Sequence, residues 1–143
     1  MSLVLLTTSC IGNRDGSEEQ LREAVDSFAV SYFNYDFMKA RRFCTEESKK
    51  WLQYAASNVH QADVDILREQ EEAASVNIED LTITGDSTAR VRISVHNFLR
   101  MDTIGKAGRM TDEATYALKA MIREGKWYIR MEDLPRSEKP DRD

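Results

Sequence analysis

The sequence has few of the residues that catalytic and metal sites require. Its 143 residues include only two histidines, His60 and His96, and only two cysteines. It contains no His-x-x-His or Cys-x-x-Cys motif and no acidic loop with calcium-binding spacing. Phosphate-binding glycine loops, dinucleotide fingerprints and nucleophilic triads are also absent. We therefore expect no metal, no cofactor and no catalytic residue.

Long apolar runs and excess positive charge are absent too. After residue 10, no stretch approaches the roughly 18 consecutive apolar residues of a membrane-spanning helix. The formal net charge is −5, whereas phosphate backbones attract basic surfaces, so nucleic acid is not an expected partner. The hydrophobic content of 41% and the charged content of 31% are ordinary for a globular chain of one domain.

The first ten residues differ from the rest of the chain. Leu3–Leu6 is a short apolar run, followed by three small residues and then Cys10. This order resembles the end of a bacterial lipoprotein signal peptide, whose cysteine becomes lipidated. We therefore interpret 1–10 as a lipoprotein-like signal segment, Cys10 as the lipid-attachment residue and 11–16 as a tether. The protein would then be anchored in the bacterial cell envelope, periplasmic or surface-exposed, and would touch the membrane only through its lipid. The alternative location is the cytoplasm.

The expected state of the second cysteine, Cys44, depends on that of Cys10. If Cys10 carries lipid, Cys44 has no partner for a disulfide within the chain. Cys44 lies at the end of a helical stretch, where a buried and inert thiol is expected. A catalytic cysteine would need a histidine beside it.

The segment from 17 to about 70 has apolar residues at three- and four-residue spacing, which predicts four helices. The first runs to about Asn34, and the last is short. Each helix has a polar residue at its expected start: Ser17, Asp36, Thr45 and Asp63.

From Val76 onward the apolar period changes to two, which predicts strands. The turn Gly85–Ser87 would pair Ile83 with Ala89 and Leu81 with Val91. Because Val76 and Ile78 are out of phase with Leu81, we expect a bulge near Glu79 and Asp80. Residues 100–111 contain two glycines and are predicted to form a long, mobile loop.

Residues 113–133 give the strongest local signal in the chain. Two alternating segments flank Glu124-Gly125, which predicts a hairpin with a two-residue loop. The register would pair Ile122 with Trp127, Ala120 with Ile129, and Leu118 with Met131. The polar, proline-containing residues 135–143 are expected to form a disordered tail.

Helices followed by a meander predict an α+β domain over 17–134. Its N-terminal helices would pack on a curved antiparallel sheet of four strands.

Three stretches carry a family resemblance: Phe33–Phe43, Gly85–Val91 and Glu124–Ile129. They resemble the helix-to-helix step and the sheet of the nuclear transport factor 2-like superfamily, and especially its small bacterial lipoproteins without an assigned function. The similarity spans about 17–133. It implies a cone-shaped α+β roll that encloses a cavity and is often dimeric through the sheet. Members of this superfamily include isomerases, dehydratases, ligand-binding modules and protein-docking domains, so the fold alone does not decide the function.

Two groups of residues are candidate sites. The first could line the wide end of a cavity for a small organic ligand: Tyr32, Trp51, Tyr54, Tyr116 and Trp127. The alternative is that they simply fill the core. Proton-transfer catalysis would require an acid or a histidine in the cavity. The predicted inward faces of the strands contain neither.

The second group is basic and belongs to the predicted outward face of the sheet: Arg90, Arg92, His96, Lys119, Tyr128 and Arg130. Lys119 lies opposite Arg130 in the hairpin register. Because directly opposed like charges are unfavourable, a countercharge is expected from Glu132, from a second subunit or from another partner. A homodimer through this face is one hypothesis, and an ordinary solvated face is the other.

These features favour a non-enzymatic, lipid-anchored binding or interaction module. The alternatives are an isomerase- or dehydratase-type enzyme that uses the cavity for proton transfer, and a structural accessory subunit with a filled core.

Overall fold

A computed structural model describes residues 18–85, 87–101 and 105–138. Several predictions fall outside this part of the chain: the signal segment 1–10 with Cys10, the tether 11–16, the cap Ser17 and residues 139–143 of the tail.

The described helices precede the sheet, as predicted. They are α2 (Glu18–Phe33), α3 (Phe37–Ala40), α4 (Lys49–Ser57) and α5 (Gln61–Glu69), with short 3-10 turns at Arg41–Phe43 and Glu46–Ser48. The predicted cap of α3 is confirmed, because the Asp36 side chain accepts a hydrogen bond from the Lys39 amide at 3.2 Å. Thr45 precedes a 3-10 turn rather than α4 itself, and its hydroxyl lies 2.5 Å from that of Ser48.

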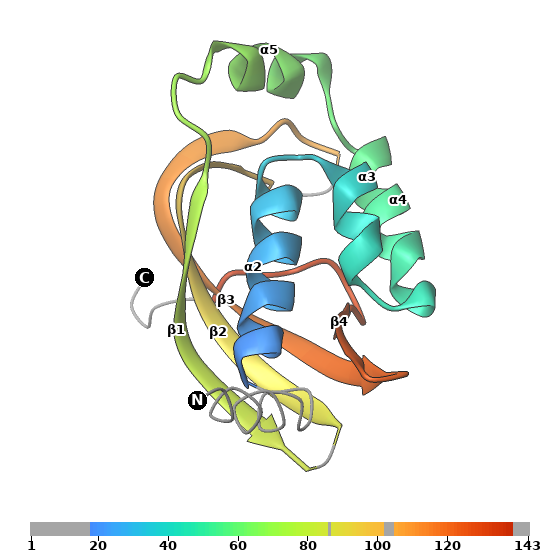
Figure 1. The fold of residues 1–143 in the computed structure, drawn as a ribbon. Coiled ribbons are helices and arrows are strands. Elements are labelled where there is room, and N and C mark those ends of the chain that lie inside the picture. Colours follow the sequence, from blue (N-terminus) through green and yellow to red (C-terminus); the bar gives the residue numbers. More distant parts are fainter. Residues whose placement is uncertain (1–17, 86, 102–104, 139–143) are drawn as a thin grey trace, which may run out of the picture.

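The sheet is a four-stranded antiparallel meander in the order β1-β2-β3-β4. Its strands are β1 (Ser75–Thr84), β2 (Thr88–Arg100), β3 (Arg109–Arg123) and β4 (Lys126–Arg130). Figure 1 shows the long strands β2 and β3 curving around α2, with α3 and α4 to one side. The α+β class and the segregated order of helices and strands agree with the prediction.

The predicted registers are confirmed at the first and last hairpins. Ile83 pairs with Ala89, and the register shifts between Ile78 and Asp80, where the bulge was expected. Ile122 pairs with Trp127.

The loop of the last hairpin matches its sequence signal. Glu124 (φ 53°) and Gly125 (φ 80°) both have left-handed backbone, as the tight two-residue turn requires. The predicted pairing of Leu118 with Met131 is not formed, because β4 ends at Arg130 and the Met131 amide instead donates to the Ser48 hydroxyl at 2.7 Å.

The core lies between α2 and the concave face of the sheet. Its largest fully buried side chains include Phe28, Phe98 and Ile129. Cys44 is also buried, as predicted, and its backbone forms an isolated β-bridge with that of Ile129 of β4. Burial raises the pKa of the Cys44 thiol to about 11, so the thiol remains protonated and inert at neutral pH.

The structure corrects the predicted start of α5. Asp63 is not the N-cap residue but lies at the third position of the helix, and His60 occupies the N-cap. The Asp63 carboxyl accepts a hydrogen bond from the His60 amide at 2.8 Å. The carboxyl therefore reaches back to the helix start from inside the first turn.

The connection between β2 and β3 is shorter than predicted. Arg100 still pairs with Arg109, and Leu99 pairs with Met110, so both ends of the predicted 100–111 loop belong to strands. Residues 102–104 lie outside the described part. The connection is shorter because the backbone pairing of β2 with β3 continues to Arg100 and Arg109.

The structure corrects the prediction for residues 135–138, which were expected to belong to a disordered tail but lie against the sheet. Ser137 forms a bridge with Tyr116 of β3, and the Glu138 amide donates to the Thr115 carbonyl at 2.7 Å. Residues 135–138 therefore lie against the part of β3 beyond its pairing with β4.

No described helix is long and apolar enough to cross a membrane.

Candidate functional site

The space between the helices and the sheet is almost filled. The gap there, called the interior gap below, has a volume of about 30 Å³, room for about one or two water molecules. It is lined by Tyr32, Phe33, Tyr35, Phe37, Phe98, Leu99, Arg100, Met101, Tyr116 and Pro135. A small organic ligand has no room in it.

Three of the residues that line the interior gap carry phenol groups: Tyr32, Tyr35 and Tyr116. The Tyr35 hydroxyl donates to the Leu99 carbonyl at 2.9 Å. Burial holds the pKa values of Tyr32 and Tyr35 well above the ordinary range. Both phenols are therefore neutral at physiological pH and cannot act as general bases there.

The structure brings only two of the five predicted cavity residues to the interior gap. Tyr32 and Tyr116 line it. Trp127 is buried in the core beside the last hairpin turn. Trp51 and Tyr54 contact each other on α4, with ring centroids 6.2 Å apart, and Tyr54 is 43% exposed. Trp51, Tyr54 and Trp127 therefore do not line the gap.

Asp63 is the only buried ionisable side chain other than cysteine and tyrosine in the described part of the chain. One of its carboxyl oxygens accepts from His60, and the other accepts from the Gly108 amide at 2.7 Å. Both oxygens are thus engaged by backbone donors. This arrangement fixes α5 to the β2–β3 connection, and the Asp63 side chain is fully buried.

On the outward face of the sheet, the structure supplies one expected countercharge. Lys119 and Arg130 are opposed, as predicted. Glu132 lies between them, at 3.1 Å from the Lys119 amine and 3.4 Å from the Arg130 guanidinium. The repulsion between the two cations is therefore relieved within the chain.

A second countercharge comes from the C-terminal segment. Glu138 lies 3.2 Å from the Arg92 guanidinium, and the Arg100 guanidinium donates to the Ser137 hydroxyl at 2.7 Å. His96 is half-buried and lies 3.2 Å from the Ser94 hydroxyl.

The remaining predicted residues of this face lie on neighbouring strands. Arg90 is exposed and pairs with Lys119 across β2 and β3, and Tyr128 is half-buried opposite Met121. A homodimer through this face stays a prediction. The electrostatic reason for a dimer is weaker than the sequence suggested, because Glu132 and Glu138 already form ion pairs with three of the cations.

A larger opening lies on the helical side of the molecule. This helix groove, between α3 and α4, has a volume of about 510 Å³. Its lining comes from both helices and the residues beside them: Tyr35, Asp36, Phe37, Met38, Arg41, Lys49, Lys50, Leu52, Gln53 and Ala56. Volumes of roughly 300–1,000 Å³ are typical of sites for small molecules.

The end of α2 positions one wall of the helix groove. The Asn34 amide group donates to the Ala74 carbonyl at 3.2 Å, and its oxygen accepts from the Ala74 amide at 2.9 Å, which joins the helix end to β1. Tyr35 then adopts a left-handed backbone, with φ of 63°. A left-handed residue at this position commonly ends a helix, and here it redirects the chain into α3.

One end of the helix groove is basic. An adjoining hollow of about 530 Å³ shares Asp36, Met38, Arg41 and Lys49 with it and is also lined by Lys39 and Arg42. Four cations and one carboxylate therefore surround this basic end, on a chain of net charge −5. Lys49 also pairs with Glu46 at 3.0 Å.

The other end of the helix groove is apolar. A hollow of about 320 Å³ shares Tyr35, Phe37 and Ala56 with it and continues over Val59, Val64 and Leu67 to Arg68. The helix groove thus adjoins one hollow lined by four cations and another lined mainly by apolar side chains.

None of the residues predicted as site residues lines the helix groove. The basic pairs Arg41-Arg42 and Lys49-Lys50 were visible signals. Their proximity depends on the packing of α3 against α4, which no local pattern specifies.

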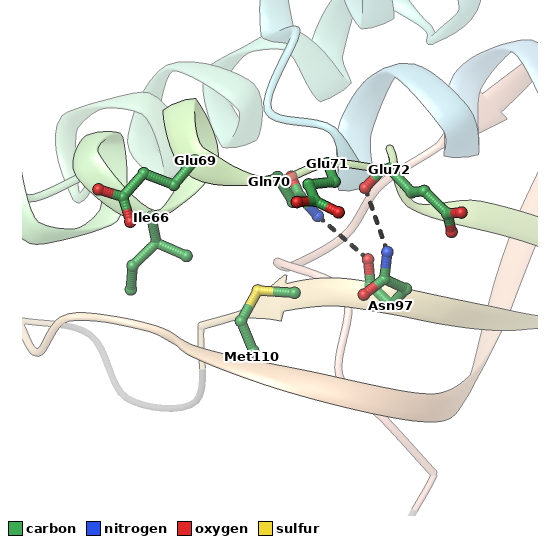
Figure 2. Close-up of a pocket in the computed structure, with 7 residues that line it drawn as sticks. All are labelled: Ile66, Glu69, Gln70, Glu71, Glu72, Asn97 and Met110. Atoms are coloured by element: carbon green, nitrogen blue, oxygen red, sulfur yellow. Dashed lines mark hydrogen bonds between the residues drawn. The ribbon is translucent and has the colours of Figure 1, made fainter.

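A third opening is acidic and lies beside α5. This acidic groove has a volume of about 460 Å³ and is lined by Ile66, Glu69, Gln70, Glu71, Glu72, Asn97 and Met110. Figure 2 shows its two hydrogen bonds, from the Gln70 side chain to the Asn97 carbonyl at 3.2 Å and from the Asn97 side chain to the Glu72 carbonyl at 3.1 Å. Both bonds involve backbone carbonyls and fix the segment after α5 to β2, so they serve the fold.

Among the described residues, no group of three or more histidine, cysteine, aspartate or glutamate side chains is placed to hold a metal ion. No protein-family profile matches the chain, and no curated protein sequence matches it significantly. The resemblance to the nuclear transport factor 2-like superfamily therefore stays a prediction.

Proposed function

We propose that the chain is a non-enzymatic, lipid-anchored binding module of the bacterial cell envelope, and that it binds through the helix groove. The observation that carries the proposal is the contrast between two volumes. The interior gap measures about 30 Å³, whereas the helix groove measures about 510 Å³ and has both apolar and charged walls. An apolar surface with a few convergent polar groups is the usual setting of a ligand site.

The buried acid Asp63 and the phenols of Tyr32 and Tyr35 favour binding over proton-transfer catalysis. A general base needs a free lone pair directed at the substrate and a pKa near the working pH. Asp63 uses both carboxyl oxygens for backbone donors. The phenols of Tyr32 and Tyr35 have raised pKa values.

The filled interior favours a second candidate, a structural accessory subunit. Such a subunit needs a stable packed body and no ligand site. The helix groove separates the two candidates, because a purely structural role gives no reason for a cationic end joined to an aliphatic one.

Native mass spectrometry of the protein, expressed with its leader in a bacterial host, tests the binding function. We expect a covalent lipid mass on Cys10 and a non-covalent adduct that is lost in Ala56→Glu, since Ala56 is exposed within the helix groove. Ala62→Glu, on an exposed position of α5, is the matched control. If no adduct of any kind appears, the structural alternative replaces the binding function.

A further inference from the structure

The helix groove has a direction that restricts its ligand. Cations gather at one end, where Lys39, Arg41 and Lys49 line the hollow next to α3. Aliphatic side chains gather at the other end, where Val59, Val64 and Leu67 line the hollow next to α5. The helix groove shares residues with both hollows, and the number of lining cations decreases from four at the basic end to one, Arg68, at the apolar end.

From this gradient we infer that the helix groove binds a single-chain aliphatic carboxylate, with its head at the basic end and its chain along the apolar end. This inference rests on the proposed binding function and adds the chemical class of the ligand. The carboxylate head would lie near Arg41 and Lys49. A guanidinium matches a carboxylate in a two-bond geometry, and an ammonium adds a compact charge.

The acids near the basic end offset only part of this charge. The Asp36 carboxyl accepts from the Lys39 amide at the start of α3. Glu46 pairs with Lys49 but does not line the helix groove or the basic hollow. Lys50, which also lines the helix groove, lies over the Trp51 ring, with its amine 5.5 Å from the ring centroid. The basic end therefore keeps an excess of positive charge for an anionic head.

The middle of the helix groove suits an aliphatic chain. Phe37 and Leu52 line it, and Met38 is 72% exposed beside it. The flexible thioether of methionine adapts to aliphatic ligands. Covering this surface with a hydrocarbon chain removes apolar area from water, which favours binding.

Isothermal titration calorimetry of the full chain with laurate, below its micelle concentration, tests the inference. Two probes separate the contributions: butyrate keeps the head and shortens the chain, and dodecyltrimethylammonium keeps the chain and reverses the charge. We expect laurate to bind at least about tenfold more tightly than either, because charge-assisted hydrogen bonds and chain burial are each worth more than the free energy of a tenfold change.

Variants locate the binding. Arg41→Gln with Lys49→Gln should weaken laurate binding by at least about tenfold through the loss of the head contacts. Ala56→Glu should abolish it by placing a carboxylate where the helix groove meets its apolar end. Lys106→Gln with Lys126→Gln removes two exposed cations that line neither the helix groove nor its two hollows, and should leave laurate binding unchanged. Thermal melts of each variant confirm that the fold is retained.

Several results would overturn the inference. One is equal affinity for laurate and dodecyltrimethylammonium, and another is wild-type affinity in the Arg41 and Lys49 double variant. Binding of an acidic amphipathic peptide, or of phosphatidylglycerol vesicles, without any response to laurate would reject the ligand class. Such a result would leave the binding function standing, whereas the absence of any adduct in native mass spectrometry counts against that function itself.

Discussion

The carboxyl group of Asp63, at the start of α5, accepts a hydrogen bond from the backbone amide of Gly108, 2.7 Å away and 45 residues later in the chain. The same carboxyl accepts from the amide of His60. Asp63 is fully buried, so these two donors replace the water that would otherwise solvate it. One side chain thus holds a helix end and a strand connection together.

The first prediction concerns this buried carboxyl. Asp63→Ala should lower the free energy of unfolding by about 2–4 kcal/mol, because it removes two hydrogen bonds and leaves two backbone donors without their partner. Urea denaturation measures the loss. Asp65→Ala is the matched control, because Asp65 is exposed on the same helix and should change stability little. Equal stability of the two variants would contradict the structural role of Asp63.

Gly108, the other partner, gives a second prediction. A Cβ atom at this position would lie 2.8 Å from the Arg100 carbonyl oxygen and 3.2 Å from the Leu99 side chain. Gly108→Ala should therefore cost about 1–3 kcal/mol of unfolding free energy through overpacking. A neutral effect in the same denaturation assay would mean that the β2–β3 connection shifts without penalty.

Local patterns predicted those parts of the fold that depend on neighbours in sequence. The pairing of Ile122 with Trp127 follows from period two and from a turn whose two residues accept left-handed backbone. The Asp63–Gly108 contact has no such local signal. Asp63 looks like any helix cap from the sequence, and only tertiary packing shows that it reaches a second segment.

The candidate site was less predictable for the same reason. Aromatic residues were chosen because they could line a cavity, but packing between α2 and the sheet leaves an interior gap of only about 30 Å³. The helix groove instead arises where α3 and α4 pack at an angle that the sequence does not encode locally. Arg41 and Lys49 are eight positions apart, and their convergence depends on the intervening 3-10 turns.

The third prediction concerns pH. Hydrogen bonds from Arg123 lower the pKa of the exposed Glu47 carboxyl to about 2. An unfolded glutamate has a pKa of about 4.3. Because the pKa of Glu47 is lower in the folded state than in the unfolded state, its pairing with Arg123 stabilises the fold fully above about pH 4.3. It is lost as the pH falls through the folded value of about 2.

A carboxyl-detected NMR titration measures this shift directly. Arg123→Gln should return the pKa of Glu47 toward the ordinary glutamate value, since the guanidinium is its first cause. Lys126→Gln, at the adjacent hairpin end, is the control and should leave the Glu47 titration low. An unchanged Glu47 titration in Arg123→Gln would show that another group holds the pKa down.

The fourth prediction concerns the lipid anchor. Expressed with its leader in a bacterial host, the protein should fractionate with membranes, because the apolar run before Cys10 resembles a lipoprotein signal. Cys10→Ala should release it into the soluble fraction, while Cys44→Ala should not, since Cys44 is buried. Identical fractionation of the wild type and Cys10→Ala would exclude lipid attachment at this cysteine.

The last prediction concerns assembly through the outward face of the sheet. Arg90, Lys119 and Arg130 form one row across β2, β3 and β4. Glu132 contacts two of these three cations. A second copy that covers the face would need to reorganise these ion pairs, so we expect the dimer to be weak.

Salt should separate this dimer from an ordinary solvated face. Charge contacts weaken as the Debye length falls from about 10 Å at 0.1 M salt to about 3 Å at 1 M. Sedimentation velocity should therefore show a species larger than the monomer at low salt and the monomer at high salt. Arg92→Glu with Arg130→Glu should give the monomer throughout, because reversed charges would repel the acidic groups of a two-fold partner. A wild-type monomer at every salt concentration would show that this row is an ordinary solvated face, with Glu132 as the countercharge of Lys119 and Arg130.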